Sequence, residues 1–224
     1  MNLSELIRQF RVESNDKVEP YFVEDQDVTA WLNEAVEEAC VRGRLVHESQ
    51  APEVCQIQVT AGNSQYKLHE ALYEITQVYF DPGQDQTIKR VRLASEEYLT
   101  RTYYEDWPLK KGHPEFAIQS DTGLRLVPCP DEDGLLMLEG YRGALTPMVE
   151  DDDSPVDLFR GHHVHLIDWA LHKAFSVSDG EFFDPNRAQI ALSNFTAYFG
   201  ERPDADLRRQ TREDTEHRVE SFFP

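Results

Sequence analysis

The period of the apolar residues changes twice along this chain, from helical to a period of two and back to helical. Asn2 and Glu5 have the spacing of a helix-capping box, and the apolar residues that follow them fall on one helical face. A longer amphipathic helix is predicted after Asp25, which we expect to cap it. Two more helices are predicted, over residues 160–177 and after Asp184. Both ends of the chain are therefore expected to be helical.

The middle of the chain, from about Val54 to Leu145, has the pattern of short strands. Apolar and polar residues alternate there, and turn-forming residues separate the short apolar runs. The turn at residues 61–64 predicts a hairpin between the strands on either side of it. One short helix, capped by Ser95 and ending at Tyr103, is expected to interrupt the strands.

These patterns predict an α+β fold in which the N- and C-terminal flanks form one helical bundle, with an inserted small antiparallel β region and an extended C-terminal arm. Neither flank alone has enough apolar surface to form a core, so the two flanks are expected to pack together. The expected boundaries are 1–50 and 150–203 for the helical body, 51–149 for the inserted β-rich region and 204–224 for the arm.

The charge of the chain limits its partners. Its 42 acidic and 22 basic residues give a formal net charge of −20, which opposes binding to a phosphate backbone. A solvated acidic surface and a surface that imitates DNA are both compatible with this composition.

No apolar run is long enough to span a bilayer, so we expect no membrane partner. The three cysteines have no metal-binding spacing, which indicates a reducing compartment.

One group of residues raises the possibility of a metal site. His165, Asp168 and His172 share one side of the predicted helix, as the ligands of a metal-dependent hydrolase would. The chain lacks an H-E-x-x-H arrangement, and a histidine cluster at a subunit contact is the favoured interpretation. No catalytic serine or cysteine arrangement and no phosphate-binding loop is present in the sequence. We therefore predict no catalytic residue, no cofactor and no enzyme activity.

The last residues are charged and have no apolar stripe, yet they end with Phe222 and Phe223. A segment that cannot bury itself but carries two aromatic anchors is typical of chains that become ordered on a partner. A disordered end is the alternative interpretation.

Two stretches of the sequence carry a resemblance to a known family. The first comprises LSELIRQFR and VEPYFVEDQDVTAWLNEAVEEA, and the second is HHVHLIDWALHKAFSVSDGEFFDPNRAQIALSNFTAYFG. In this order they resemble the flanks of head-to-tail adaptor (neck) proteins of tailed bacteriophages. The shared features include an acidic-capped helix with LNEA, a helix containing WAL, and a turn that here consists of Asp179, Glu181, Asp184 and Pro185.

The resemblance implies a structural virion protein, made in the host cytoplasm and placed at the head–tail junction. It implies a homo-oligomeric ring, commonly of twelve copies, that docks on the portal protein, meets a tail or nozzle protein, and lets genomic DNA pass without specific binding. By resemblance, residues 204–224 are the portal-binding arm. The expected contact residues are Arg208, Arg209, Arg212, Arg218, Phe222, Phe223 and Pro224. An acidic DNA mimic and, with less support, a metal-dependent hydrolase remain alternatives.

Overall fold

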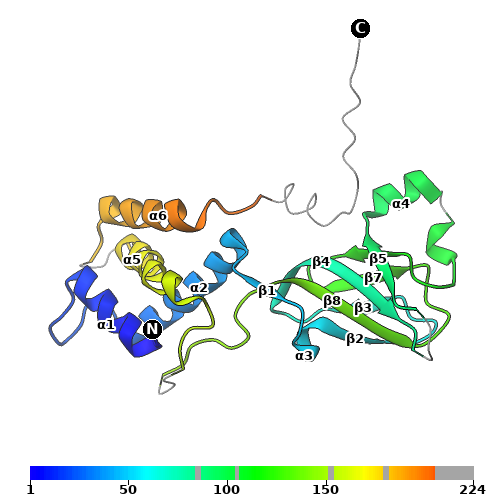
Figure 1. Ribbon diagram of the computed structural model, residues 1–224. Helices are drawn as coiled ribbons and strands as arrows, with labels where there is room; N and C mark the ends of the chain where they lie inside the picture. Colours follow the sequence, from blue (N-terminus) through cyan, green and yellow to red (C-terminus); the bar gives the residue numbers. More distant parts are fainter. Residues whose placement is uncertain (84–86, 104–105, 151–153, 179–181, 205–224) are drawn as a thin grey trace, which may run out of the picture. The chain divides into compact units, whose positions relative to one another are not determined.

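A computed structural model of the chain forms two compact units (Figure 1). The helical unit consists of Met1–Val46 and Arg142–Pro203, and the β unit consists of His47–Tyr141. The β unit therefore interrupts the sequence of the helical unit once. The structure describes residues 1–83, 87–103, 106–150, 154–178 and 182–204.

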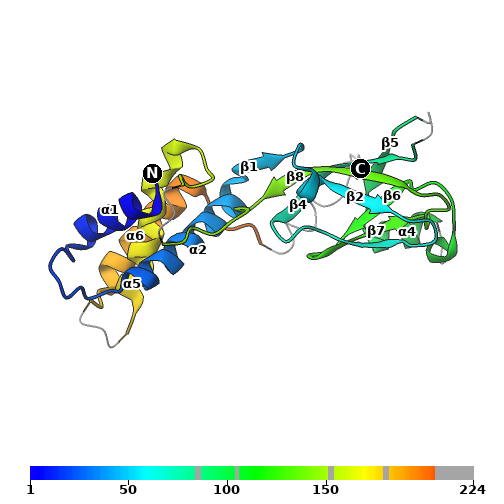
Figure 2. The same cartoon turned by 90° about the horizontal axis from the view of Figure 1, so that it is seen from below.

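The helical unit is organised around one helix, α5, which packs against the three other helices (Figure 2). The helices are α1 (Leu3–Ser14), α2 (Asp25–Gly43), α5 (Leu166–Ser176) and α6 (Pro185–Phe199), and the 3-10 helix η2 (Arg160–His165) leads directly into α5. The four α-helices all contribute fully buried side chains to the core. These are Leu6 and Phe10 from α1, Leu32 from α2, Leu166 from α5 and Phe195 from α6. No helix among the described residues is long and apolar enough to cross a membrane.

The starts of the helices follow local chemistry in two cases. The predicted capping box of α1 is confirmed, because the Asn2 side chain accepts a hydrogen bond from the backbone N–H of Glu5 and the Glu5 side chain accepts one from Asn2. The predicted start of α6 is also confirmed, with Asp184 accepting bonds from two backbone N–H groups. The prediction that Asp25 caps α2 is wrong. The N-cap is Glu24, which makes no capping side-chain bond, and the Asp25 carboxylate contacts a side chain of α1.

The β unit contains eight strands among the described residues. The strands are β1 (Val46–Glu48), β2 (Gln56–Val59), β3 (Gln65–Lys67), β4 (Leu72–Asp81), β5 (Lys89–Leu93), β6 (Phe116–Gln119), β7 (Gly123–Val127) and β8 (Gly134–Arg142). They pair in the order β1-β8-β4-β5-β6-β7-β3, with β2 also pairing with β8. The short helices of this unit are α3 (Pro52–Cys55), α4 (Glu96–Tyr103) and η1 (Trp107–Leu109).

The predicted fold class, a helical bundle with a small antiparallel β region, is therefore wrong. The described strands join into one curled eight-stranded sheet, which is a major part of a mixed fold. The sheet is also not purely antiparallel, because β5 and β6 are parallel. Most of the strands are only three to five residues long and look minor in the sequence. β4 and β8, with ten and nine residues, are long enough for several short strands to assemble around them.

The hairpin predicted at residues 61–64 is also wrong. A turn is present there, and Gly62 takes the positive φ of 83° that the turn requires. The strands on either side do not pair with each other, since β2 pairs with β8 and β3 pairs with β7. The N–H of Gly62 instead donates to the carbonyl of Pro130, 2.8 Å away. Local turn chemistry was predictable, but the partners of the two strands were not.

The sheet separates two apolar clusters, one on each face. The larger cluster includes Ile75, Val78 and Val91, none of which has exposed surface. On the other face, α4 and η1 cover a smaller cluster that includes Trp107 and Phe116. Successive residues of β6 divide between them, because Phe116 belongs to the smaller cluster and the next residue to the larger one.

The close approach of β4 and β8 gives a test of this sheet. A Cβ atom at Gly140 would lie 2.2 Å from the carbonyl oxygen of Glu74. We expect Gly140→Ala to lower the free energy of unfolding by about 2 kcal/mol, because overpacking a filled site forces the backbone to shift. Urea unfolding followed by circular dichroism measures the change. Glu139→Ala, on the opposite face of the same strand, is the control, and we expect it to change stability by less than about 0.5 kcal/mol. Equal stability of Gly140→Ala and the wild type would contradict this strand pairing.

Candidate functional site

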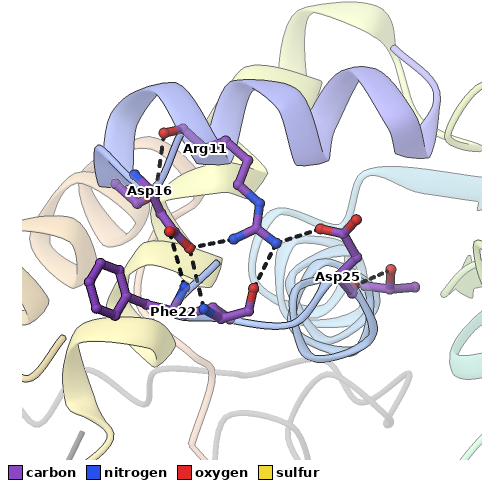
Figure 3. A network of polar contacts seen from close by, with 7 residues as sticks. Arg11, Asp16, Phe22 and Asp25 are labelled. Carbon is purple, nitrogen blue, oxygen red and sulfur yellow. Dashed lines mark hydrogen bonds and ion pairs between the residues drawn. The ribbon is translucent and has the colours of Figure 1, made fainter. Parts of the chain in front are cut away.

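A buried arginine joins α1 to α2 and to the loop between them (Figure 3). Arg11, in the last turn of α1, is only 6% exposed. Its Nη1 donates to Oδ2 of Asp16 at 2.5 Å, and its Nη2 donates to Oδ1 of Asp25 at 2.5 Å and to the carbonyl of Val23 at 2.7 Å. A charge buried in this way is tolerated only when it is paired and hydrogen-bonded. The ion pairs therefore hold the start of α2 against α1.

Asp16 also fixes the path of the loop. Its carboxylate accepts hydrogen bonds from the backbone N–H groups of Phe22 and Val23, at 3.1 and 3.3 Å. Asn15, one residue earlier, ends α1 in the left-handed conformation with φ of 67°. Nothing in the sequence pattern indicates this network. A charged residue on a short amphipathic helix is normally solvent-exposed, and the two acidic partners are five and fourteen residues further along.

The same loop exposes apolar side chains. Val18 is 77% exposed and Phe22 is 60% exposed, while the Phe22 ring stacks on Phe182 with 5.7 Å between ring centroids. Phe182 in turn stacks on Phe175 of α5 at 5.1 Å, and its neighbour Phe183 is 50% exposed. Grouped exposed apolar side chains are typical of surfaces that contact another protein. We call Val18, Phe22 and Phe183 the loop-end surface.

The three residues considered as metal ligands contact three different residues of α6. The pairs are His165 stacked on Tyr198 at 3.5 Å between ring centroids, Asp168 accepting from Asn194 at 3.3 Å, and the His172 ring 3.0 Å from the carbonyl of Ala188. The described residues include no group of three His, Cys, Asp or Glu side chains that would hold a metal. The structure therefore does not bring the three together as a metal site. His165 at the end of η2, together with Asp168 and His172 of α5, thus forms a row of polar contacts with α6.

Burial changes the proton affinity of several groups in the helical unit. It raises the pKa of Asp168 above its ordinary value, and it lowers the pKa of His163, whose Nε2 lies 3.0 Å from the carbonyl of Leu158. Burial raises the pKa of the Cys40 thiol to about 12. A thiol with this pKa stays protonated near neutral pH and is a poor nucleophile. Cys40 therefore serves as a small apolar side chain in the core.

The predicted contact residues of the C-terminal arm lie outside the described residues. They are Arg208, Arg209, Arg212, Arg218, Phe222, Phe223 and Pro224. Their role stays a prediction.

Comparison with known proteins identifies a family. A family model described as SU10 adaptor protein matches residues 1–219. No curated protein matches the chain. The match includes both segments of the helical unit, the whole β unit and most of the C-terminal segment. It confirms the family resemblance drawn from the sequence.

The arginine network predicts a large effect of one substitution. We expect Arg11→Met to lower the free energy of unfolding by about 3–5 kcal/mol, because it leaves the carboxylate of Asp16 buried without its cationic partner. Arg11→Met combined with Asp16→Asn should recover part of this loss. Arg8→Met, one turn earlier and exposed, is the matched control and should change stability by less than about 0.5 kcal/mol. Urea unfolding of the four proteins measures these differences, and equal losses in the two single variants would contradict the network.

His163 predicts how stability depends on pH. Because burial lowers its pKa below the ordinary 6.5, the unfolded chain binds a proton at this site more readily than the folded chain. Its contribution to stability is therefore complete above pH 6.5 and is lost as the pH falls below that value. We expect thermal unfolding of the wild type to show a steeper loss of stability between pH 7 and pH 5 than unfolding of His163→Gln. Parallel pH profiles for the two proteins would contradict this assignment.

Proposed function

Because the chain belongs to the SU10 adaptor protein family, a family of phage head-to-tail adaptors, we propose that it is one subunit of a ring that docks on the portal protein and connects the capsid to the tail or nozzle. Membership of the family makes it a structural component of the virion. The observation that carries the proposal is the extent of the match, residues 1–219, because it includes the whole helical unit, the β unit and most of the C-terminal segment.

The surface of the helical unit supports a role in assembly. The loop-end surface exposes three large apolar side chains, and Phe159, before η2, is 76% exposed. On α6, Ile190 is 62% exposed. Burying such side chains at a contact stabilises it by about 25 cal/mol for each Å² removed from water. We propose that neighbouring copies and the portal cover these side chains in a ring, with twelve as the expected copy number.

The net charge of −20 supports a passage for DNA. Phosphate groups and carboxylates repel each other, so an acidic wall lets a duplex move without being retained. In this proposal the genomic DNA passes through the ring without specific binding, and the protein has no catalytic role.

We propose the C-terminal segment as the portal-binding arm of a helical body built from residues 1–50 and 150–203, with residues 51–149 as the inserted β-rich region. Phe222 and Phe223 would insert into apolar pockets of the portal, since aromatic anchors supply much of the energy of protein contacts. Arginines of the segment would pair with acidic groups at the rim, where charges mainly direct the encounter.

Deletion of residues 204–224 tests this proposal. The truncated protein should keep its fold, measured by circular dichroism, and lose capture by immobilised portal complexes. We expect Phe222→Ala with Phe223→Ala to reduce the affinity at least tenfold, because each buried phenylalanine supplies more than 1 kcal/mol.

A full-length variant with the order of residues 204–221 scrambled and the two phenylalanines kept is the control for composition. It should lose less affinity than the double alanine variant if the rings are the anchors. Portal capture of the truncated protein at the wild-type level would refute the arm assignment, and failure of the wild-type protein to bind portal complexes would refute the adaptor ring as proposed.

A further inference from the structure

The exposed side of α1 borders a groove of about 420 Å³. One wall is the second stripe of α1, which lies beside the buried stripe and includes Ile7, Arg8 and Val12. The other wall comes from the loop and the start of α2, with Lys17 and Tyr21. Val12 is 49% exposed and Tyr21 is 39% exposed, so apolar surface remains open to solvent on both walls.

The groove carries positive charge in a strongly acidic chain. Arg8 and Lys17 are exposed at its edge, and Arg11 lies beneath the Tyr21 ring, with 4.0 Å from the guanidinium carbon to the ring centroid. Asp16 and Asp25 both pair with Arg11, so these three cations and two carboxylates leave one positive charge in excess, at the exposed Arg8 and Lys17. The Nε atom of Arg11 is buried and has no hydrogen-bond partner among the described residues. The groove thus combines apolar walls with a local attraction for a carboxylate.

A segment of the same chain has the complementary composition. Residues 149–155, with the sequence VEDDDSP, contain four consecutive acidic residues after a valine, and we call this segment the acidic connector. Both of its ends are attached to the helical unit. The Asn33 side chain exchanges two hydrogen bonds with the backbone of Met148, at 2.8 and 3.0 Å, and the N–H of Val156 donates to the carbonyl of Met1 at 3.2 Å.

The described residues of the acidic connector do not line the groove of their own chain. We infer that the groove on α1 binds the acidic connector of a second copy, with Val149 against the apolar walls and carboxylates against the exposed Arg8 and Lys17. The inference rests on the proposed ring and names the contact between neighbours in it. Because the groove and the acidic connector are different surfaces, each copy would bind one neighbour through its groove and the other neighbour through its acidic connector. Such head-to-tail contacts produce a closed ring when the rotation between copies closes.

A labelled peptide of sequence VEDDDSP tests the contact without requiring assembly. We expect it to bind the full-length wild-type protein saturably at 50 mM salt, measured by fluorescence anisotropy, and to bind at least tenfold more weakly at 500 mM salt, where exposed charges are screened. Arg8→Glu with Lys17→Glu should weaken binding at least tenfold. The same peptide with Asn and Gln in place of its Asp and Glu residues should not bind.

Lys89→Glu with Arg101→Glu is the matched control variant. These residues are also exposed but lie in the β unit, and the double substitution changes the net charge by the same amount. Its affinity for the peptide should stay within twofold of the wild type. Circular dichroism verifies that both double variants are folded, and Arg8→Gln with Lys17→Gln replaces the glutamate variant if that one unfolds. Absence of saturable binding to the wild type, or equal weakening in the groove and control variants, would overturn the inference.

A charge exchange tests the contact in the assembled protein. Arg8→Glu with Lys17→Glu, and separately Asp151→Lys with Asp152→Lys, should each abolish the formation of rings on portal complexes, and one chain carrying all four substitutions should form rings again. Rings formed by the groove variant as readily as by the wild type would refute the groove contact. Peptide binding by a wild-type protein that forms no rings would leave the contact standing and refute the ring, so the two proposals fail in different experiments.

Discussion

The helical unit depends on the neutralisation of one buried guanidinium. Arg11 lies between α1 and α2, and leaving its buried charge unpaired would cost about 3–5 kcal/mol. Its two carboxylate partners lie on either side of the loop between the helices, so pairing the charge also closes the loop. The apolar side chains of that loop are then left on the surface, and the second stripe of α1 is left uncovered. The exposed apolar side chains of the unit are thus a consequence of how its interior charge is satisfied.

What could be predicted from the sequence is what depends on neighbours in the sequence. The capping of α1 by Asn2 and of α6 by Asp184 involves residues within three positions, and both were predictable. Asp25 failed as a cap because an arginine fourteen residues away binds its carboxylate. In the β unit the strands were located approximately, but the size and pairing of the sheet depend on contacts between distant segments. The family was recognisable because its motifs are local, whereas the arginine network and the groove exist only in the folded unit.

The described surface of the helical unit is suited to association with other proteins. The buried thiol of this unit is held protonated, and the side chains that resembled a metal set are used to join helices. The helical unit instead exposes aromatic and aliphatic side chains, and it has a locally basic groove on an acidic chain. Burying these groups at a contact with another protein would contribute free energy of binding. Such surfaces are typical of proteins that bind other proteins.

The first and last strands of the β unit, β1 and β8, are neighbours in the sheet. The chain therefore enters and leaves this unit at adjacent positions, and the two segments of the helical unit meet across a short gap whatever lies between them. The free energy of closing a loop grows only slowly with its length, so the stability of the helical unit is nearly independent of the number of residues inserted. A change in the size of the inserted sheet is thus expected to have little effect on the fold of the helical unit.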